Sequence, residues 1–357
     1  FLMKFSPTGT LIWSRLFGGP NYTRAYSVAL DYSGHVIIAG RSGKSLATTT
    51  GVFQTAFAGQ DNGNYGYQNG FVAKFDCSDG TLVAASYVGT GTLCRTVCVG
   101  LDDTIYVPLA YSALTADDPD ANTLSWGPAA LASAYQGSRA SASYPCCGVV
   151  AIASDMASVL WATYFGFTDG FVRPAGSVKV DANNNVFLFG ATSSALLPVT
   201  AGVPGTTLGG SQDAYIAKFG ANGQSIAWCT YLGGNGGAEE LNTQQIILDS
   251  SGNCIAATPT DSTNFPVTAG CFQSTKKAGN DIGIAILAAA NGALVAGTYF
   301  GGSGNEQPDG VAVDADGRIL VTGNTTSTDL PVTRDAWQAQ SGGGAFDGYL
   351  AVLNSVL

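Results

Sequence analysis

The sequence holds a single histidine, two methionines and few charged residues. Charged side chains make up 11% of the 357 residues, against about 25% in ordinary soluble domains. Catalytic triads built on imidazole and histidine-rich zinc sites need either several histidines or one beside a nucleophile, and the lone His35 argues against both. His35 follows Ser33 and Gly34, so we predict an exposed turn residue at the start of a strand.

The sequence has 15 Lys and Arg and 25 Asp and Glu, which gives a formal net charge of −10. Nucleic acids and anionic membrane surfaces attract clusters of Lys and Arg, so this balance argues against both as partners. No apolar run approaches the length of about 18 residues that indicates a membrane span. Residues 1–5 have the pattern of a strand rather than of a signal sequence, so we expect any leader to be absent or already removed.

Three short apolar patterns each recur five times. The first ends in two apolar or aromatic residues and a glycine, and it occupies residues 11–18, 82–89, 159–166, 226–233 and 294–301. The second ends at Asp31, Asp102, Asp181, Asp249 and Asp314, and another apolar run follows after a short turn. The third occupies residues 71–75, 149–153, 215–219, 284–287 and 349–353. Each repeat therefore contains four predicted strands.

The short turns after the second pattern are typical of β-hairpins. Glycine follows three residues after Asp31, Asp249 and Asp314 and suits a positive φ, and Asn184 replaces it in the third repeat. A segment between the second and third strands recurs in four of the repeats; three copies contain the motif Leu/Phe-Pro-Val-Thr, and three contain an aromatic residue before glutamine, which we predict to pack on the hydrophobic edge of its own sheet. Its positions include Phe53, Phe272 and Trp337.

Four short strands in every repeat, without a long helical pattern between them, predict an all-β fold, a β-propeller of four-stranded antiparallel blades. Stacked blades bury one another's faces, which a single blade cannot do alone. We expect one domain over residues 1–357, with repeat units at about 19–89, 90–166, 167–233, 234–301 and 302–357, the last closed by residues 1–18. An insertion occupies about residues 112–145 of the second unit.

The last repeat carries the most specific motifs. It reads Tyr-Phe-Gly-Gly-Ser-Gly-Asn at 299–305, Gly-Val-Ala-Val-Asp at 310–314, Gly-Arg-Ile-Leu-Val-Thr-Gly at 317–323 and Asp-Leu-Pro-Val-Thr at 329–333. In these motifs the chain resembles the SBBP (seven-bladed β-propeller) repeats of bacterial secreted proteins. The resemblance implies an exported or surface-linked propeller, often within a longer multidomain chain, and it supplies no catalytic residues.

The resemblance names seven blades, whereas five repeats are visible, so the chain forms either a closed five-bladed ring or part of a larger propeller. One strand is in surplus, because residues 1–5 fit the third pattern and compete with 349–353 for one place. It could lie outside as an added edge or be donated to a neighbouring molecule, which would generate an assembly. The residues of this candidate assembly strand are Phe1, Leu2, Met3, Lys4 and Phe5.

Eight cysteines, without any C-x-x-C pair, favour disulfides over a metal site. Their positions are Cys77, Cys94, Cys98, Cys146, Cys147, Cys229, Cys254 and Cys271. Proximity within repeats suggests that Cys271 meets Cys229 or Cys254, and that Cys77 meets Cys94 or Cys98. The adjacent pair 146–147 could form a vicinal ring, but strain favours two separate partners.

Three other groups of residues are candidate sites. Asp118, Asp120 and Asn122 alternate like the start of a calcium loop but lack its glycine and final glutamate, and a solvated acidic loop is the alternative. Asn21 and Asn324 fit the glycosylation sequon. Residues 239–240 are adjacent glutamates, which point opposite ways in an extended chain and so cannot form a glycosidase pair by themselves.

The scarcity of catalytic residue types favours a non-enzymatic role. We expect an extracellular or cell-surface structural propeller, a subunit of a filament, sheath, surface layer or adhesive assembly, with no cofactor apart from the candidate calcium. Expected partners are further copies or other surface proteins, and glycans in the alternative of a carbohydrate-binding or carbohydrate-cleaving propeller.

Overall fold

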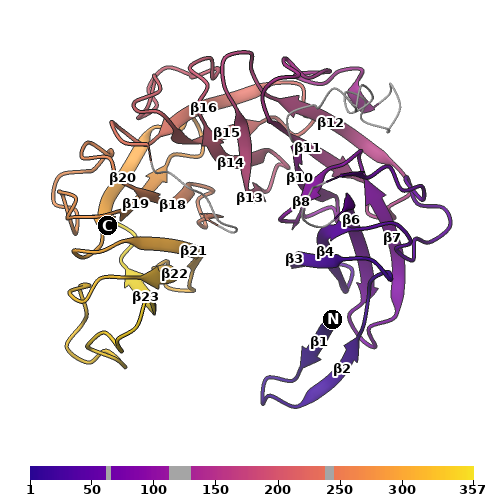
Figure 1. Cartoon of the computed structure of the whole chain (residues 1–357), viewed down its shortest axis with the longest axis horizontal. Coiled ribbons are helices and arrows are strands. Elements are labelled where there is room, and N and C mark those ends of the chain that lie inside the picture. The colour runs from indigo at the N-terminus through magenta and orange to yellow at the C-terminus, as the bar shows by residue number, and fades with distance from the viewer. Residues whose placement is uncertain (62–65, 112–129, 238–244) are drawn as a thin grey trace. The chain divides into compact units, whose positions relative to one another are not determined.

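The computed structural model describes residues 1–61, 66–111, 130–237 and 245–357 (Figure 1). The described chain is built of antiparallel β-strands, and neighbouring strands of each sheet are mostly neighbours in sequence. The predicted all-β propeller fold of antiparallel blades is therefore confirmed. The chain divides into two compact units, residues 1–166 with 222–225 and residues 167–221 with 226–357.

The first unit contains two large sheets and a separate hairpin. The hairpin is formed by β1 (Leu2–Phe5) and β2 (Leu11–Arg15). The first large sheet contains β3 (Thr23–Leu30), β4 (His35–Ser42), β6 (Tyr67–Asp76) and β7 (Leu82–Val88), with β5 (Gln60–Asp61) paired to the start of β6. The second contains β8 (Leu93–Cys94), β9 (Cys98–Val99), β10 (Ile105–Tyr111), β11 (Cys146–Ile152) and β12 (Val159–Phe165). Its first strand is thus split in two, and both pieces pair with β10.

The second unit contains three sheets. The first has the order β13 (Val172–Val180), β14 (Val186–Thr192), β15 (Asp213–Phe219) and β16 (Ile226–Leu232). The next has the order β17 (Ile246–Leu248), β18 (Cys254–Thr260), β19 (Asp281–Leu287) and β20 (Leu294–Phe300). The last has three strands, β21 (Glu306–Val313), β22 (Ile319–Thr325) and β23 (Asp347–Leu353). Closure of this sheet by residues 1–18, and with it the choice between a five-bladed ring and a larger propeller, stays a prediction.

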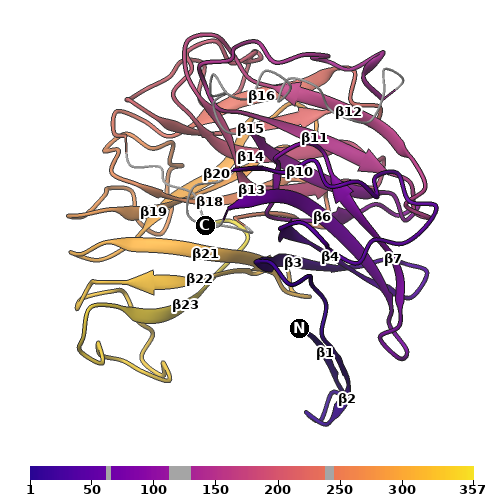
Figure 2. The same ribbon diagram turned by 45° about the vertical axis from the view of Figure 1, so that its right-hand side comes forward.

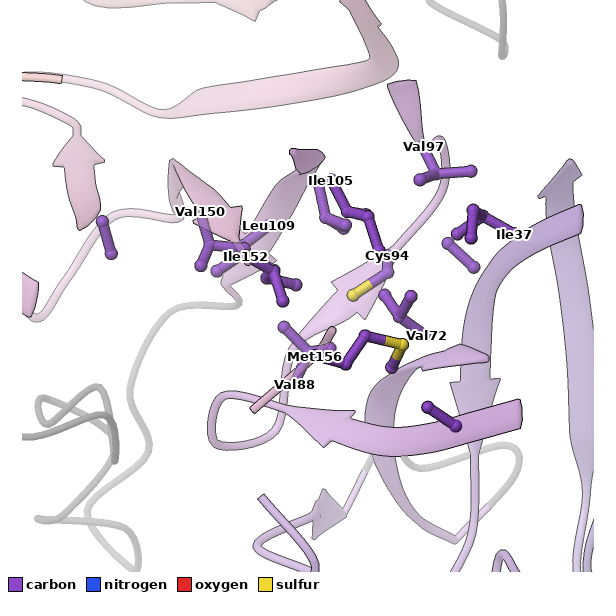
Figure 3. Close-up of a cluster of buried hydrophobic side chains, with 14 of the residues drawn as sticks. Ile37, Val72, Val88, Cys94, Val97, Ile105, Leu109, Val150, Ile152 and Met156 are labelled. Carbon is purple, nitrogen blue, oxygen red and sulfur yellow. The ribbon is translucent and has the colours of Figure 1, made fainter. Parts of the chain in front are cut away.

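Middle strands are buried on both faces in the sheets that precede the last one. Every residue of β11, β14, β15, β18 and β19 is buried, whereas the outer strands begin exposed and end buried. In the first unit, Ile37 and Val72 of one sheet pack with Ile105 and Val150 of the next (Figure 3). A fully buried aliphatic or aromatic side chain contributes about 1.5–3 kcal/mol, so sheet-on-sheet packing is the main stabilising contribution.

The predicted hairpin turns are present. Asp249 and Asp314 each accept the backbone N–H groups of the residues two and four positions later, and the turn glycines Gly252 and Gly317 have φ values of 76° and 79°. Asn184 takes the same conformation with φ of 60°, as the sequence predicts. Short turns with an aspartate acceptor thus connect the first two strands of these repeats.

Candidate functional site

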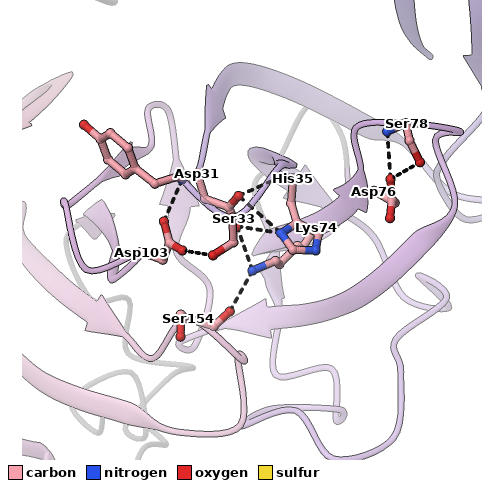
Figure 4. A network of polar contacts seen from close by, with 9 residues as sticks. Asp31, Ser33, His35, Lys74, Asp76, Ser78, Asp103 and Ser154 are labelled. Carbon is pink, nitrogen blue, oxygen red and sulfur yellow. Dashed lines mark hydrogen bonds and ion pairs between the residues drawn. The ribbon is translucent and has the colours of Figure 1, made fainter.

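A buried polar cluster joins the two large sheets of the first unit (Figure 4). Asp31 closes the turn between β3 and β4, with Oδ1 accepting the His35 N–H at 2.6 Å and Oδ2 lying 2.9 Å from His35 Nδ1. Lys74 of β6 places Nζ 2.8 Å from Asp31 Oδ2. The same ammonium donates to the backbone oxygen of Ser154, beyond the end of β11, at 3.0 Å. The lysine therefore connects the turn of one sheet to the backbone of the next.

The Asp31 carboxylate is stabilised in its charged form. Burial raises the pKa of Asp31, but the hydrogen bond from Lys74 and the backbone N–H of His35 outweigh burial and hold the pKa below its ordinary value. His35 begins β4 as predicted, but its side chain is only 23% exposed and contacts the carboxylate. The expectation of an exposed turn residue is therefore wrong, because Asp31 draws the imidazole inward.

The second unit repeats this cluster without a histidine. Lys218 Nζ lies 3.0 Å from Asp181 Oδ2 and donates to the backbone oxygen of Ala289 in the next sheet at 2.9 Å. Asn185 takes the position of the histidine and donates Nδ2–H to Asp181 at 2.9 Å. An amide that replaces imidazole keeps the hydrogen bond but exchanges no proton near neutral pH. The cluster is therefore a structural clamp between sheets.

A tryptophan completes the clamp in the second unit. Trp228 of β16 donates Nε1–H to the Ala289 oxygen at 3.1 Å, so this oxygen accepts from both the lysine and the tryptophan. The ring lies against Gly292, which has φ of 70°, and a Cβ there would meet the ring at 2.7 Å. A side chain at this position would therefore displace the tryptophan from the next sheet.

The N-terminal hairpin makes the same contacts with the first large sheet. Lys4 Nζ of β1 and Trp13 Nε1 of β2 both donate to the backbone oxygen of Cys77, at 2.8 and 3.1 Å. Gly80 has φ of 74°, and a Cβ there would lie 2.8 Å from the Trp13 ring. The hairpin thus occupies the place of the third and fourth strands of a sheet.

The hairpin forms a two-stranded sheet among the described residues (Figure 2). In complete sheets the third strand also pairs with a second strand, as β15 pairs with β14. Among the described residues, β1 pairs only with β2. Leu2 packs against the first large sheet, whereas Phe1 is 84% exposed and Met3 and Phe5 are also exposed on the hairpin. The hairpin is a candidate interaction site with one free strand edge and an apolar face.

The last sheet has three strands among the described residues. Its order ends at β23, with no fourth strand beside it in the described residues, and Leu350 and Val352 of this strand are exposed. Trp337 is fully exposed, and Phe272 of the preceding repeat is more than half exposed. The prediction that these aromatics pack on their sheet edge is wrong for Trp337, which is fully exposed. Phe272 contacts Phe300 of β20, whereas no fourth strand lies beside β23 among the described residues.

The structure contains no disulfide bond, so the predicted disulfides are not present in it. The two candidates for Cys271 lie in different sheets, Cys229 in β16 and Cys254 in β18. Each of these two side chains is buried, and burial raises the pKa of Cys229 to about 12. Closeness in the sequence therefore did not identify cysteines that are bonded to each other in the structure.

The remaining candidate sites have varied outcomes. The calcium candidates Asp118, Asp120 and Asn122 and the glutamates at 239–240 lie outside the described residues, as does much of the predicted insertion. Asn21 and Asn324 are described, and their amides donate to Lys44 O at 2.8 Å and to Asp309 Oδ2 at 3.4 Å; their glycosylation stays a prediction. In the described part of the chain, no cluster of three or more His, Cys, Asp or Glu side chains is placed to hold a metal ion.

Sequence reasoning missed the Lys–Trp clamp, although its signal is present. Ala-Lys-Phe recurs at 73–75 and 217–219, and Met-Lys-Phe stands at 3–5. Tryptophan occurs at the third position of the glycine-ending pattern in residues 13, 161 and 228. Two residues on neighbouring strands that recur together indicate a shared partner, and here the partner is one backbone oxygen of the next sheet.

Comparison with known proteins supports the repeat assignment. The match that identifies the repeat family lies in the last repeat. Residues 297–331 match the SBBP β-propeller repeat family. No curated protein matches the chain. The described residues contain no helix of the length and apolar character that crossing a membrane requires.

Three solved structures are similar to the chain at low sequence identity. A protein of unknown function from Dyadobacter fermentans is 13% identical, with 98% of this chain and 80% of that chain covered and a TM-score of 0.48. The polysaccharide lyase Uly1 is 8% identical; the alignment covers 94% of this chain and 58% of that chain, with a TM-score of 0.42. The β-propeller domain of the Trilobed protease from Pyrococcus furiosus is 8% identical; the alignment covers 93% of this chain and 70% of that chain, with a TM-score of 0.39.

Proposed function

We propose that this protein is a non-enzymatic interaction scaffold, a subunit of an extracellular surface assembly that associates with further copies through β1. The observation that carries the proposal is the hairpin at residues 2–15. Lys4 and Trp13 hold it on the first large sheet, while the second edge of β1 pairs with no strand among the described residues. Unpaired strand edges template pairing with another chain. The secreted character of SBBP repeats supports the extracellular setting.

The residues of β1 suit pairing with a second copy of themselves. Antiparallel pairing of two β1 strands, centred on Met3, would place Phe1 of one copy opposite Phe5 of the other. Both rings are exposed in the single chain, and a cross-strand aromatic pair contributes about 0.2–1 kcal/mol. The result would be a four-stranded sheet, the strand number of the complete sheets in the second unit.

The test measures the assembly state of the chain over a range of concentrations, by light scattering after size exclusion and by electron microscopy. The test variant combines Met3→Lys with Phe5→Lys, which places charges beside the free edge. The matched control combines Val83→Lys with Val295→Lys, two similarly exposed positions on strands of other sheets. Self-association should be lost in the test variant and kept in the control.

The assembly state also separates the two modes of pairing. A dimer would indicate pairing of β1 with β1, and a polymer would indicate pairing of β1 with a different edge of the neighbouring copy. A monomer at all concentrations would refute the proposal. A glycan array and a panel of hydrolase assays address the carbohydrate alternative, and tight saturable sugar binding or turnover would favour it instead.

A further inference from the structure

Two buried carboxyl groups meet where the sheet of β17–β20 contacts the sheet of β21–β23. Asp281 begins β19 and Glu306 begins β21, and these two strands pack against each other (Figure 1). Asp281 is 0% exposed and Glu306 is 1% exposed. A Cβ added at Gly301 would lie 2.6 Å from Asp281 Oδ1 and 2.5 Å from Glu306 Oε2. Both carboxyl groups therefore face the same point, and the glycine leaves room for them.

Glu306 holds the connection between β20 and β21, residues 301–305, in place. Its Oε2 accepts the Gly302 N–H at 2.9 Å, and its Oε1 accepts the hydroxyl groups of Thr325 at 2.6 Å and Ser327 at 2.5 Å. Ser327 Oγ in turn accepts the Gly304 N–H at 2.7 Å. The conformation of the connection therefore depends on both oxygens of Glu306.

Asp281 has one oxygen that accepts no hydrogen bond. Its Oδ2 accepts the Gln273 Nε2–H at 2.6 Å and the Lys277 N–H at 2.9 Å. Its Oδ1 is buried and has no hydrogen-bond partner among the described residues. A charged oxygen in this position is unfavourable, because it has lost water without gaining a donor. A proton on Oδ1 removes the penalty, since a protonated carboxyl oxygen is itself a donor.

The preceding sheet shows why this oxygen lacks a donor. Asp213 begins β15 at the register position that Asp281 has in β19. Both oxygens of Asp213 accept backbone N–H groups, and Oδ1 accepts that of Gly234 at 3.3 Å. Gly302 has the place of Gly234 in the repeat, but its N–H donates to Glu306. Glu306 therefore takes the donor that the equivalent aspartate uses.

The surroundings of Asp281 favour its neutral form. Burial raises the pKa of Asp281, and the Glu306 carboxylate also raises it; the hydrogen bonds to Oδ2 and the charge of Lys276 oppose these causes without outweighing them. Among the described residues, the titratable groups that face Asp281 are Glu306 of β21, Lys276 of the loop before β19 and Tyr299 of β20. Burial raises the pKa of Tyr299 above its ordinary value, so this phenol stays neutral near neutral pH.

We propose that Asp281 and Glu306 form a proton-controlled latch between the last two sheets. With a proton on Oδ1, Asp281 is neutral and donates toward Glu306 Oε2, and β19 stays packed against β21. When this proton passes to water, two buried carboxylates face the same point and repel each other. The connection at 301–305 then opens, because Glu306 is the acceptor that holds it. The latch is independent of self-association through β1, since it involves other residues.

The latch is closed in acid and opens as pH rises. A carboxyl group whose folded pKa is raised stabilises the closed form fully below the unfolded value of about 3.9, and this stabilisation is lost as pH rises through the folded pKa. The equilibrium constant for opening should increase up to about tenfold per pH unit across this window. The direction is opposite to that of Asp31, whose pKa is lowered.

Amide hydrogen exchange of the whole chain between pH 4 and 8 tests the latch. Protection is expressed relative to the intrinsic exchange rate at each pH, so that it reports the opening equilibrium alone. In the parent, protection of the amides of residues 302–306 should fall about tenfold over this range. In Asp281→Asn, whose amide N–H replaces the proton, the fall should be less than about twofold.

Asp213→Asn is the matched control, because it changes the equivalent aspartate of the preceding sheet. It should keep the pH dependence of the parent at residues 302–306. Glu306→Gln removes the second carboxylate, so protection should be lower at every pH and should lose most of its pH dependence. This variant separates repulsion between two carboxylates from burial of Asp281 alone.

Infrared spectroscopy observes the proton directly. The parent should keep the carbonyl band of a neutral carboxyl group above the ordinary aspartate pKa of about 3.9, and this band should be missing in Asp281→Asn. Absence of the band, or the same pH dependence of protection in Asp281→Asn as in the parent, would overturn the proposal. So would a pH dependence that Glu306→Gln leaves unchanged.

Discussion

Replacing Lys74 with methionine should strongly destabilise the first unit. The Asp31 side chain is 0% exposed, and Lys74 Nζ lies 2.8 Å from it. Methionine keeps the apolar stem but leaves the buried carboxylate without the ammonium, and breaking a buried ion pair in this way costs about 3–5 kcal/mol. The Ser154 oxygen loses its lysine donor as well. Urea unfolding followed by tryptophan fluorescence should show the loss as a lower midpoint.

A double variant and a change of pH test the cause. Asp31→Asn combined with Lys74→Met removes both charges and should recover part of the loss. The pKa of Asp31 is lowered in the folded state, so its stabilisation is present above the unfolded value of about 3.9 and is lost as pH falls through the folded pKa. The difference between Lys74→Met and the parent should therefore shrink in acid. A loss below about 1 kcal/mol at neutral pH, typical of surface pairs, would refute the reasoning.

Three further predictions concern buried groups. Tyr299→Phe removes the hydroxyl between Ser262 O and Phe265 N, and unfolding should show a loss of about 1–3 kcal/mol, an unchanged midpoint being the contrary result. Burial raises the pKa of Asp281, so the parent should lose stability relative to Asp281→Asn as pH rises from about 3 to 7, whereas a difference independent of pH would contradict this cause. The buried thiols should resist iodoacetamide in the native protein, and all eight should react after unfolding without reductant; incomplete reaction would restore the predicted disulfides.

Much of the fold could be predicted because its information is local. The aspartate turns, Gly252 and Asn184 specify hairpins through bonds to residues two to four positions away. Short apolar runs mark the strands, and repetition of the same four strands predicts sheets that pack face to face. Pairs such as Ile255 opposite Ile286 then follow from adjacency in the chain.

The candidate site was less predictable, because its contacts join distant segments. Residues 1–5 could be assigned to the third-strand pattern, but the attachment of Lys4 and Trp13 to Cys77 O depends on how one sheet packs on the next. The disulfide pairs were inferred from spacing along the chain, whereas the sulfur positions depend on which strand and which face each cysteine occupies. Trp337 shows the same effect, since it is exposed in the one sheet of the second unit that has three strands among the described residues.

The amino-acid sequence alone determined the class of fold, the strand pattern and the turn chemistry, since each depends on short-range backbone preferences repeated along the chain. Only the tertiary structure decided that His35 joins a structural clamp, that no disulfide bond joins the cysteines and that β1 pairs only with β2 among the described residues. These properties depend on which surfaces meet when one sheet packs on the next, and the order of residues does not state which surfaces those are.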